Sequence, residues 1–182
     1  MSAEIETDAL KVLEEFALPE YNEIPDVGLY LKQTVKYLSE YLEPVQGITI
    51  TESMVSNYVK QKLVESPVRK EYHRDQIALL FFIAFAKSVL SLEEIRFLIG
   101  VMGKSGYDIR RAYLFLCREL KADLAEITTH NAPKHPYPAD AEVSEAKSLF
   151  RNVIITVANK IYIDAYFAVF AEKTEKTETA EN

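Results

Sequence analysis

A cluster of basic side chains is the clearest chemical feature of this chain. Residues 56–74 contain five cations and two anions, a net charge of +3. The whole 182-residue chain carries −7, so the rest of the chain carries −10. Attraction between exposed charges fades within about 10 Å at 0.1 M salt. A basic patch on an acidic chain therefore indicates a surface that faces a polyanion. The five cations are Lys60, Lys62, Arg69, Lys70 and Arg74.

Polar side chains at the start of the cluster have the spacing needed to read DNA bases. They recur at i, i+3, i+4 and i+7, which places them on one face of a helix. Short polar and cationic side chains on an exposed helix reach base edges in the major groove, and an asparagine can pair with an adenine edge through two hydrogen bonds. The predicted base-reading face comprises Ser53, Ser56, Asn57 and Lys60.

The turn after this helix would supply contacts to phosphate. We expect Arg69, Lys70 and Arg74 to grip the DNA backbone, with Lys62 and His73 beside them. Such contacts give affinity without sequence information. The alternative is a solvated polar helix face followed by an ordinary charged turn, because solvated charge is the default on a protein surface.

Catalytic and cofactor chemistry find little support in the sequence. It contains no glycine-rich phosphate loop, no nucleophile elbow and no HExxH motif, so we expect neither an enzyme nor a bound cofactor. His130 and His135 lie in a proline-rich connector without an acidic or thiol ligand nearby, which favours two exposed histidines over a metal site. Cys117, the single cysteine, lies in an apolar helical stripe and is expected to be a core residue.

Several helices are expected to position the basic cluster. Apolar spacing predicts helices over residues 26–43, 51–62, 75–90, 91–103 and 107–126. Asp26 and Thr51 are the expected N-caps of the first two, and Ser91 and Glu94 form an S-x-x-E capping box. The third helix is apolar on every side, which places it at the centre of the domain. Residues 47–51 fit a loop or a short extended piece, so the predicted class is all-α with at most a small β-ribbon near the basic turn.

The chain is expected to divide into five segments. An acidic N-terminal segment, with a short helix that Pro19 ends, is followed by a helical domain, a proline-rich connector, a C-terminal helix and a disordered charged tail. The acidic N-terminus lacks the pattern of a signal peptide, so we expect a soluble cytoplasmic protein. The five segments cover residues 1–24, 25–127, 128–140, 141–171 and 172–182.

The C-terminal helix has an apolar stripe wider than the roughly 100° face that a surface helix needs. We therefore expect it to pair two copies of the chain as a homodimer, with folding back onto its own domain as the alternative. The helix is too polar for a lipid span, so no membrane partner is expected. The polar residues concerned are Asn152, Asn159, Lys160 and Asp164.

The order of motifs over residues 51–99 resembles the N-terminal DNA-binding region of MerR-type transcription regulators. The resemblance rests on a tyrosine and leucine in the polar helix, a wing with proline, arginine and tyrosine, a buried helix, and the S-L-E-E-I motif. It implies a helix-turn-helix with a short wing, double-stranded DNA as partner, and a C-terminal helix that pairs two subunits. We also expect membership of an uncharacterised bacterial domain family that carries this unit behind a longer N-terminal helix. The matching residues are Tyr58, Leu63, Pro67, Arg69, Tyr72, Ile77, Leu80, Ile83 and Ser91 to Ile95.

Several positions depart from the MerR-type pattern. Ser56 and Asn57 stand where that family has an arginine and the first tyrosine, and Lys62 replaces the glycine of its Gly-Leu step. The connection over residues 44–50 is also longer than the roughly 3–4 residues of a tight helix-turn-helix turn. Two functions stay open: a DNA-binding transcriptional regulator, and a helical protein-interaction module that kept the fold and lost the DNA contacts.

Overall fold

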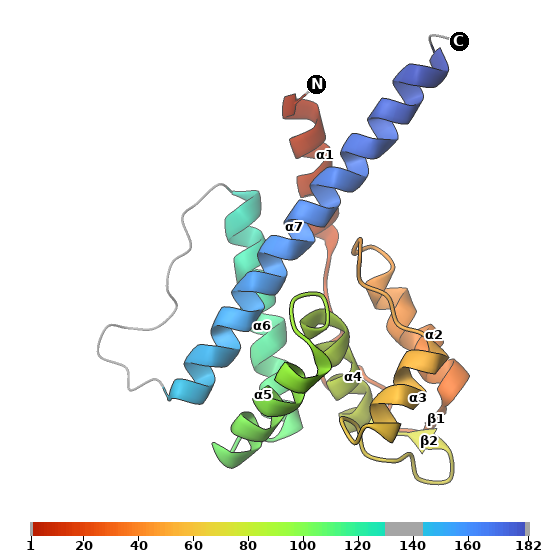
Figure 1. Cartoon of the computed structure of the whole chain (residues 1–182), viewed down its shortest axis with the longest axis vertical. Coiled ribbons are helices and arrows are strands. Elements are labelled where there is room, and N and C mark those ends of the chain that lie inside the picture. The colour runs from red at the N-terminus through yellow and green to blue at the C-terminus, as the bar shows by residue number, and fades with distance from the viewer. Residues whose placement is uncertain (1, 130–143, 181–182) are drawn as a thin grey trace.

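The computed structural model of the chain describes residues 2–129 and 144–180. This described part contains seven helices and one two-stranded antiparallel sheet, which confirms the all-α class (Figure 1). The predicted small ribbon near the basic turn also forms: its second strand, which directly follows that turn, pairs with the first. The elements are α1 (Ser2–Glu15), β1 (Leu29–Tyr30), α2 (Leu31–Leu42), α3 (Glu52–Lys60), β2 (Glu71–Tyr72), α4 (Arg74–Ala86), α5 (Leu92–Lys104), α6 (Ile109–Thr128) and α7 (Glu145–Ala180).

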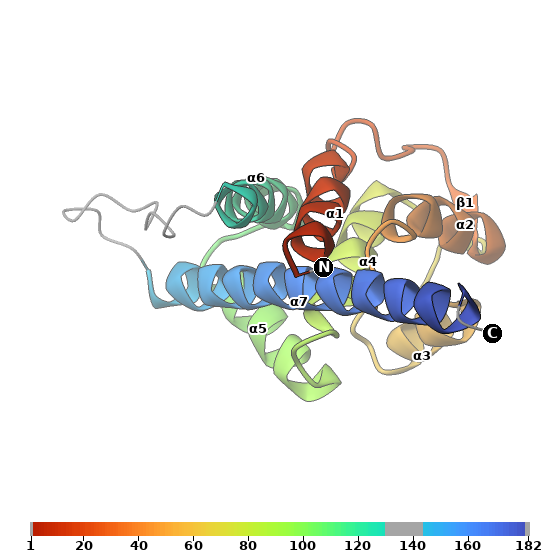
Figure 2. The same ribbon diagram turned by 90° about the horizontal axis from the view of Figure 1, so that it is seen from above.

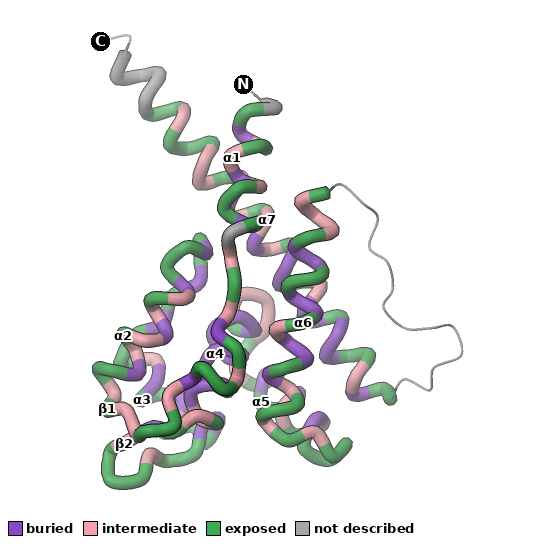
Figure 3. The backbone as a smooth tube through the Cα atoms, turned by 180° about the vertical axis from the view of Figure 1, so that it is seen from behind, coloured by how far each residue is buried: buried purple, intermediate pink, exposed green. Residues whose placement is uncertain are grey.

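Helix α4 forms the centre of the molecule, as its apolar sequence predicted. Ile77, Leu80 and Phe85 have no exposed surface at all. On one side α4 packs against α6 and α7, and on the other against α2. Helices α1, α6 and α7 lie together, whereas α2, α3 and the sheet lie across α4 from α6 (Figures 1 and 2). Buried residues accordingly concentrate along α4 and α6 and on one side of α7 (Figure 3).

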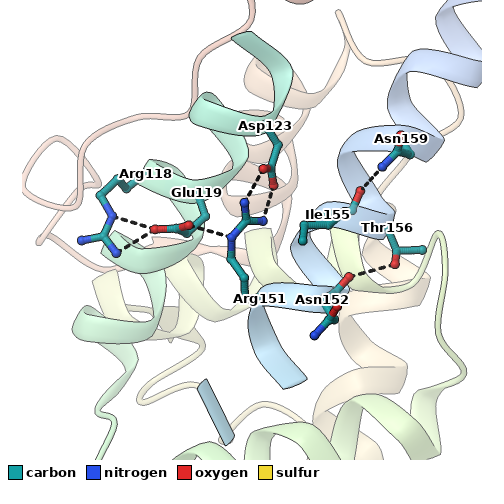
Figure 4. A network of polar contacts seen from close by, with 8 residues as sticks. All are labelled: Arg118, Glu119, Asp123, Arg151, Asn152, Ile155, Thr156 and Asn159. Carbon is teal, nitrogen blue, oxygen red and sulfur yellow. Dashed lines mark hydrogen bonds and ion pairs between the residues drawn. The ribbon is translucent and has the colours of Figure 1, made fainter. Parts of the chain in front are cut away.

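A buried ionic network joins α6 to α7 (Figure 4). The guanidinium of Arg151 on α7 donates through both terminal nitrogens to the two carboxylate oxygens of Asp123 on α6. Its Nε lies 2.8 Å from Oε2 of Glu119, whose other oxygen accepts from Nε of Arg118 at 2.8 Å. Arg151, Asp123 and Glu119 are all buried. Since a buried charge is tolerated only when it is paired, this network fixes how α7 sits on α6.

The segment before α2 differs from the prediction. Asp26 does not cap a helix; residues 26–30 stay non-helical, and β1 pairs with β2 in the register Leu29 with Tyr72. The helix begins at Leu31 because the backbone N–H of Tyr30 is satisfied by the side chain of Gln33, at 2.9 Å. Residues 47–51, the other candidate for extended structure, contain no strand and contribute Ile48 and Ile50 to the core.

Helix α7 packs against α1, α4, α5 and α6 of its own chain. Most of its wide apolar stripe is buried there, which is the fold-back arrangement given as the alternative to a dimer helix. The helix also continues past residue 171 to Ala180, into the charged segment for which the sequence predicts disorder. Alanine, glutamate and lysine are strong helix formers, and extending an existing helix costs far less than starting one.

The stretch Glu145–Glu175 of α7 is also long and apolar enough, by length and composition, to cross a membrane. Length and composition alone support this reading only weakly, because a core helix of a soluble protein has the same properties. Here Phe150, Ile154 and Ile161 from this stretch are buried in the core.

Candidate nucleic-acid interface

Helix α3 presents the predicted base-reading side chains on one exposed face. The hydroxyl of Thr51 caps the helix by accepting the backbone N–H of Met54 at 3.2 Å, as expected for its N-cap position. Val55 and Tyr58 are buried and hold the opposite face against the core, where α3 packs on α2. The exposed side chains are Ser53, Ser56, Asn57 and Lys60.

An arginine that the sequence analysis did not identify, Arg96, contacts the C-terminal end of α3. The backbone oxygen of Gln61 accepts from Nη2 of Arg96 on α5 at 2.9 Å, and the side chain of Gln61 donates to Oδ1 of Asn57 at 3.2 Å. Arg96 therefore adds an exposed cation beside Asn57. It follows the S-L-E-E-I motif directly, but its place beside α3 depends on the folding of α5, which no local pattern reveals.

Lys62, two residues after the end of α3, lies in the left-handed region of backbone conformation, with φ of 58°. Its conformation lets the N–H groups of Leu63 and Val64 return to the backbone oxygen of Tyr58, at 2.9 and 3.4 Å. Left-handed residues that close helix C-termini in this way are usually glycines. This chain therefore places a lysine in a conformation that glycine usually adopts.

Residues 65–73 form a short structure that we call the basic hairpin. Val68 and Glu71 exchange both backbone hydrogen bonds, at 3.1 and 2.9 Å, around the two-residue turn Arg69-Lys70. Both turn residues have positive φ, 53° and 71°, as in a type I′ turn, which normally carries Asn-Gly or Gly-Gly. Both turn residues, Arg69 and Lys70, are exposed.

The basic hairpin is attached to the domain through β2. Glu71 and Tyr72 pair with β1 on the side opposite the turn, so β1, β2 and Val68 form three neighbouring extended segments. The approach is close at Gly28, where an added Cβ would lie 2.6 Å from Cβ of Glu71. A side chain at position 28 would therefore push the hairpin away from the domain.

Arg74 has an internal role instead of the free phosphate contact that we predicted. Its Nε donates to the backbone oxygen of Ile24 at 2.8 Å, its Nη1 lies 3.8 Å from the Asp26 carboxylate, and its guanidinium stacks 5.6 Å above the ring of Tyr21. Only 23% of its side chain is exposed. Arg74 thus holds the segment before β1 in place. His73, by contrast, is exposed at the N-cap of α4, where its N–H donates to the side chain of Gln76.

The other candidate chemistries gain nothing from the structure. Within the described ranges, 2–129 and 144–180, no group of three or more His, Cys, Asp or Glu side chains could hold a metal ion. His130 and His135 lie outside those ranges. Cys117 is half-buried in α6, and burial raises the pKa of its thiol to about 11, which keeps it protonated and unreactive at neutral pH.

The candidate interface therefore consists of the exposed face of α3, the lysine that follows its C-terminus, the basic hairpin and Arg96. No curated protein and no solved structure matches the chain. A protein-family model, described as a domain of unknown function (DUF1836), matches residues 19–114, which include every one of these elements. The match spans more than half of the chain and confirms the expectation of an uncharacterised domain family; the chain belongs to the DUF1836 family.

Proposed function

We propose that the chain is a DNA-binding transcriptional regulator that contacts double-stranded DNA through α3 and the basic hairpin. The observation that carries the proposal is conformational. Within the described residues, three non-glycine positions have positive φ, and all three are exposed cations of the basic cluster. They are Lys62, Arg69 and Lys70.

Cationic side chains at these positions are kept against a backbone cost. The left-handed conformation costs a non-glycine residue roughly 1–2 kcal/mol, and glycine or asparagine would fill the same turn positions more cheaply. Strained positions of this kind cluster where a side chain has a functional task. For an exposed lysine or arginine the natural task is contact with phosphate.

The arrangement also separates two kinds of contact. The α3 face offers hydroxyl, amide and ammonium groups, which can read base edges in the major groove, whereas Lys62 and the hairpin tip offer cations alone. A reading helix followed by a basic wing is the arrangement expected from the resemblance to MerR-type regulators. The internal contacts of Arg74 give it a supporting role, because it braces the segment against which the hairpin packs.

A salt titration of DNA binding tests the proposal. We would measure fluorescence anisotropy with a duplex selected from genomic DNA by the purified protein. Replacing Lys62 and Lys70 with glutamine should make the slope of log K against log salt shallower by about 1.8, since each phosphate contact contributes roughly 0.9. The matched control replaces the exposed helical residues Lys104 and Lys121 with glutamine and should leave the slope unchanged. Equal slopes for the two double variants would contradict the proposed contacts.

Asn57 provides the test of sequence reading. Asn57→Ala should relax the preference at one base position by about 1–3 kcal/mol and leave binding to unrelated DNA nearly unchanged. A uniform loss on every sequence would instead assign Asn57 a structural role through its hydrogen bond with Gln61.

A homodimer formed through α7 belongs to the same proposal, because two reading helices would then meet a two-fold DNA site. Leu149, Ile163 and Phe170 remain exposed on α7, and they follow one another at multiples of seven residues, the repeat of a helix-pairing seam. Light scattering should give twice the monomer mass of 20.8 kDa. Ile163→Glu with Phe170→Glu should halve that mass without unfolding the chain. A monomeric wild-type chain at tens of micromolar would end this part of the proposal.

One observation favours the interaction-module alternative. Tyr30 and Val68 both lie opposite Glu71 in the ribbon, and both are exposed, at 54% and 63%. Residues directly opposite each other in a sheet point to the same face, so the ribbon carries a small apolar patch that a partner protein could cover. If the wild-type chain shows no affinity for DNA at low salt, this alternative replaces the regulator.

A further inference from the structure

A cavity of about 350 Å³ lies between α4, α5, α6 and the N-terminal half of α7, away from the proposed DNA-binding surface. Its wall is mostly apolar and combines side chains from four helices. Cavities of this size, lined by apolar groups with a few polar ones, are where small molecules bind in proteins. The apolar wall includes Leu79, Phe82, Ile99, Met102, Ala112 and Phe150.

The charged groups that line the cavity are all acidic. They are the carboxylates of Asp75, in the first turn of α4, and Asp108, the N-cap of α6; no lysine, arginine or histidine is among the lining residues. Arg74 and Arg110 lie nearby, but both stack against the ring of Tyr21. A complementary ligand would therefore have an apolar part that packs against the apolar wall and a positively charged hydrogen-bond donor that binds the two carboxylates.

Both carboxylates have partners that leave room for a further donor. Asp75 accepts the hydroxyl hydrogen of Tyr21 on one oxygen. One oxygen of Asp108 accepts the backbone N–H of Arg111 at 2.7 Å, and the other lies 3.8 Å from Nε of Arg111 in an exposed ion pair. An ionised carboxylate offers about four lone-pair sites, and exposed ion pairs are weak. Each group can thus accept a bond from a ligand without losing the contact that positions it.

We propose that this cavity binds a small molecule with one aromatic or branched apolar group and a primary ammonium group, the ammonium lying between Asp75 and Asp108. The apolar group of the ligand fills the part of the cavity between α4 and α6. This site is independent of the proposed DNA binding, since the α3 face and the basic hairpin contribute nothing to its wall.

Three probes of one shape test the class of ligand: 2-phenylethylamine, 2-phenylethanol and 3-phenylpropanoate. Titrations of the full chain would be followed by NMR or calorimetry. The amine should bind about tenfold more tightly than the alcohol, because a charge-assisted hydrogen bond contributes more than a neutral one. The anionic probe should bind most weakly. Equal affinity for amine and alcohol, or no binding of the amine at millimolar concentration, would overturn the proposal.

Conservative variants test the two carboxylates. Asp108→Asn keeps the helix cap, because asparagine caps as well as aspartate, and Asp75→Asn keeps an acceptor oxygen for Tyr21. Each change should reduce the advantage of the amine over the alcohol and leave the affinity for the alcohol unchanged. If both variants retain the full tenfold preference, the carboxylates do not recognise the ammonium group.

A filled cavity tests the location. Ala112 lines the cavity and is half-buried, so Ala112→Leu should weaken the binding of all three probes. Ala168→Leu is the matched control: this half-buried alanine on α7 lies outside the cavity, and its variant should bind as the wild type does. Unchanged amine binding by a folded Ala112→Leu protein would place the ligand elsewhere. The aspartate variants decide the proposal if Ala112→Leu does not fold.

Discussion

The turn of the basic hairpin allows a test in which stability and DNA affinity should move in opposite directions. Arg69→Asn with Lys70→Gly would install the pair that a type I′ turn prefers. It would relieve the left-handed strain of Lys70, which has φ of 71°, and would remove both cations from the tip. A fold held by this turn should therefore become more stable, whereas a DNA contact made by the same side chains should be lost.

The size of each effect follows from the geometry. Relief of left-handed strain is worth roughly 1–2 kcal/mol per residue, and the added freedom of glycine in the unfolded chain takes back about 0.5–1 kcal/mol. We expect a net gain of about 1 kcal/mol in the free energy of unfolding, or a rise of about 2–4 °C in Tm for a chain of this size. The loss of two phosphate contacts should lower DNA affinity by about thirtyfold at 0.15 M salt, given a slope of 0.9 per contact.

Differential scanning calorimetry and anisotropy on the same preparations would provide the two measurements. Lys70→Gln separates the causes, because it removes one charge without relieving the backbone: its salt slope should fall by about 0.9 with no gain in Tm. A more stable Asn-Gly variant with unchanged DNA affinity would refute the contact at the tip. A weaker binder with no gain in Tm would refute the argument from backbone strain.

Three further outcomes are expected. Arg151→Met should lower the free energy of unfolding by about 3–5 kcal/mol, because it leaves the carboxylate of Asp123 buried and unpaired. Urea denaturation would measure this change, and a loss below about 1 kcal/mol would show that water reaches the site. Cys117 should react with a thiol reagent at pH 8 far more slowly in the folded chain than in urea, since burial raises its pKa to about 11, and equal rates would contradict the packing of α6. Hydrogen bonds from Ser91 lower the pKa of Glu94, so the stability that Glu94 contributes is present above its unfolded pKa and is lost as the pH falls through the lower folded pKa. Glu94→Gln should therefore make the free energy of unfolding depend less on pH in this acid range. An unchanged pH profile would argue against the capping box.

The sequence predicted best the features that depend on near neighbours. Thr51 caps α3 and Ser91 forms its capping box with Glu94, because each motif needs only the next few residues. The position of α4 at the centre followed from its having no polar face. All these predictions concern one turn of helix or the sides of a single helix. The predicted N-cap at Asp26 was equally local but was wrong, because the segment that follows it pairs with the distant strand β2.

Long-range contacts account for what the sequence did not reveal. The strand β1 is two residues long and exists only because β2 lies beside it. Arg74 was predicted to be free because the residues that engage it, including Ile24 and Tyr21, come from a segment about fifty positions upstream. Arg96 was overlooked for the same reason, since its partner Gln61 lies on another helix. The DNA-binding role itself stays a prediction, which the anisotropy experiments test.

The packing of α1 and α7 has a practical consequence for work on this family. The family-matched stretch ends at residue 114, within the second turn of α6, and excludes both α1 and α7. A protein limited to that stretch would lack Phe150, whose ring centre lies 5.3 Å from that of Phe82. It would also lack Phe16, whose ring centre lies 6.0 Å from that of Phe85. The apolar side of α4 would then face water, and we expect such a fragment to aggregate. Since α1 and α7 also pack on each other, we expect that folding needs both flanks and that the unit able to fold alone is longer than the matched stretch.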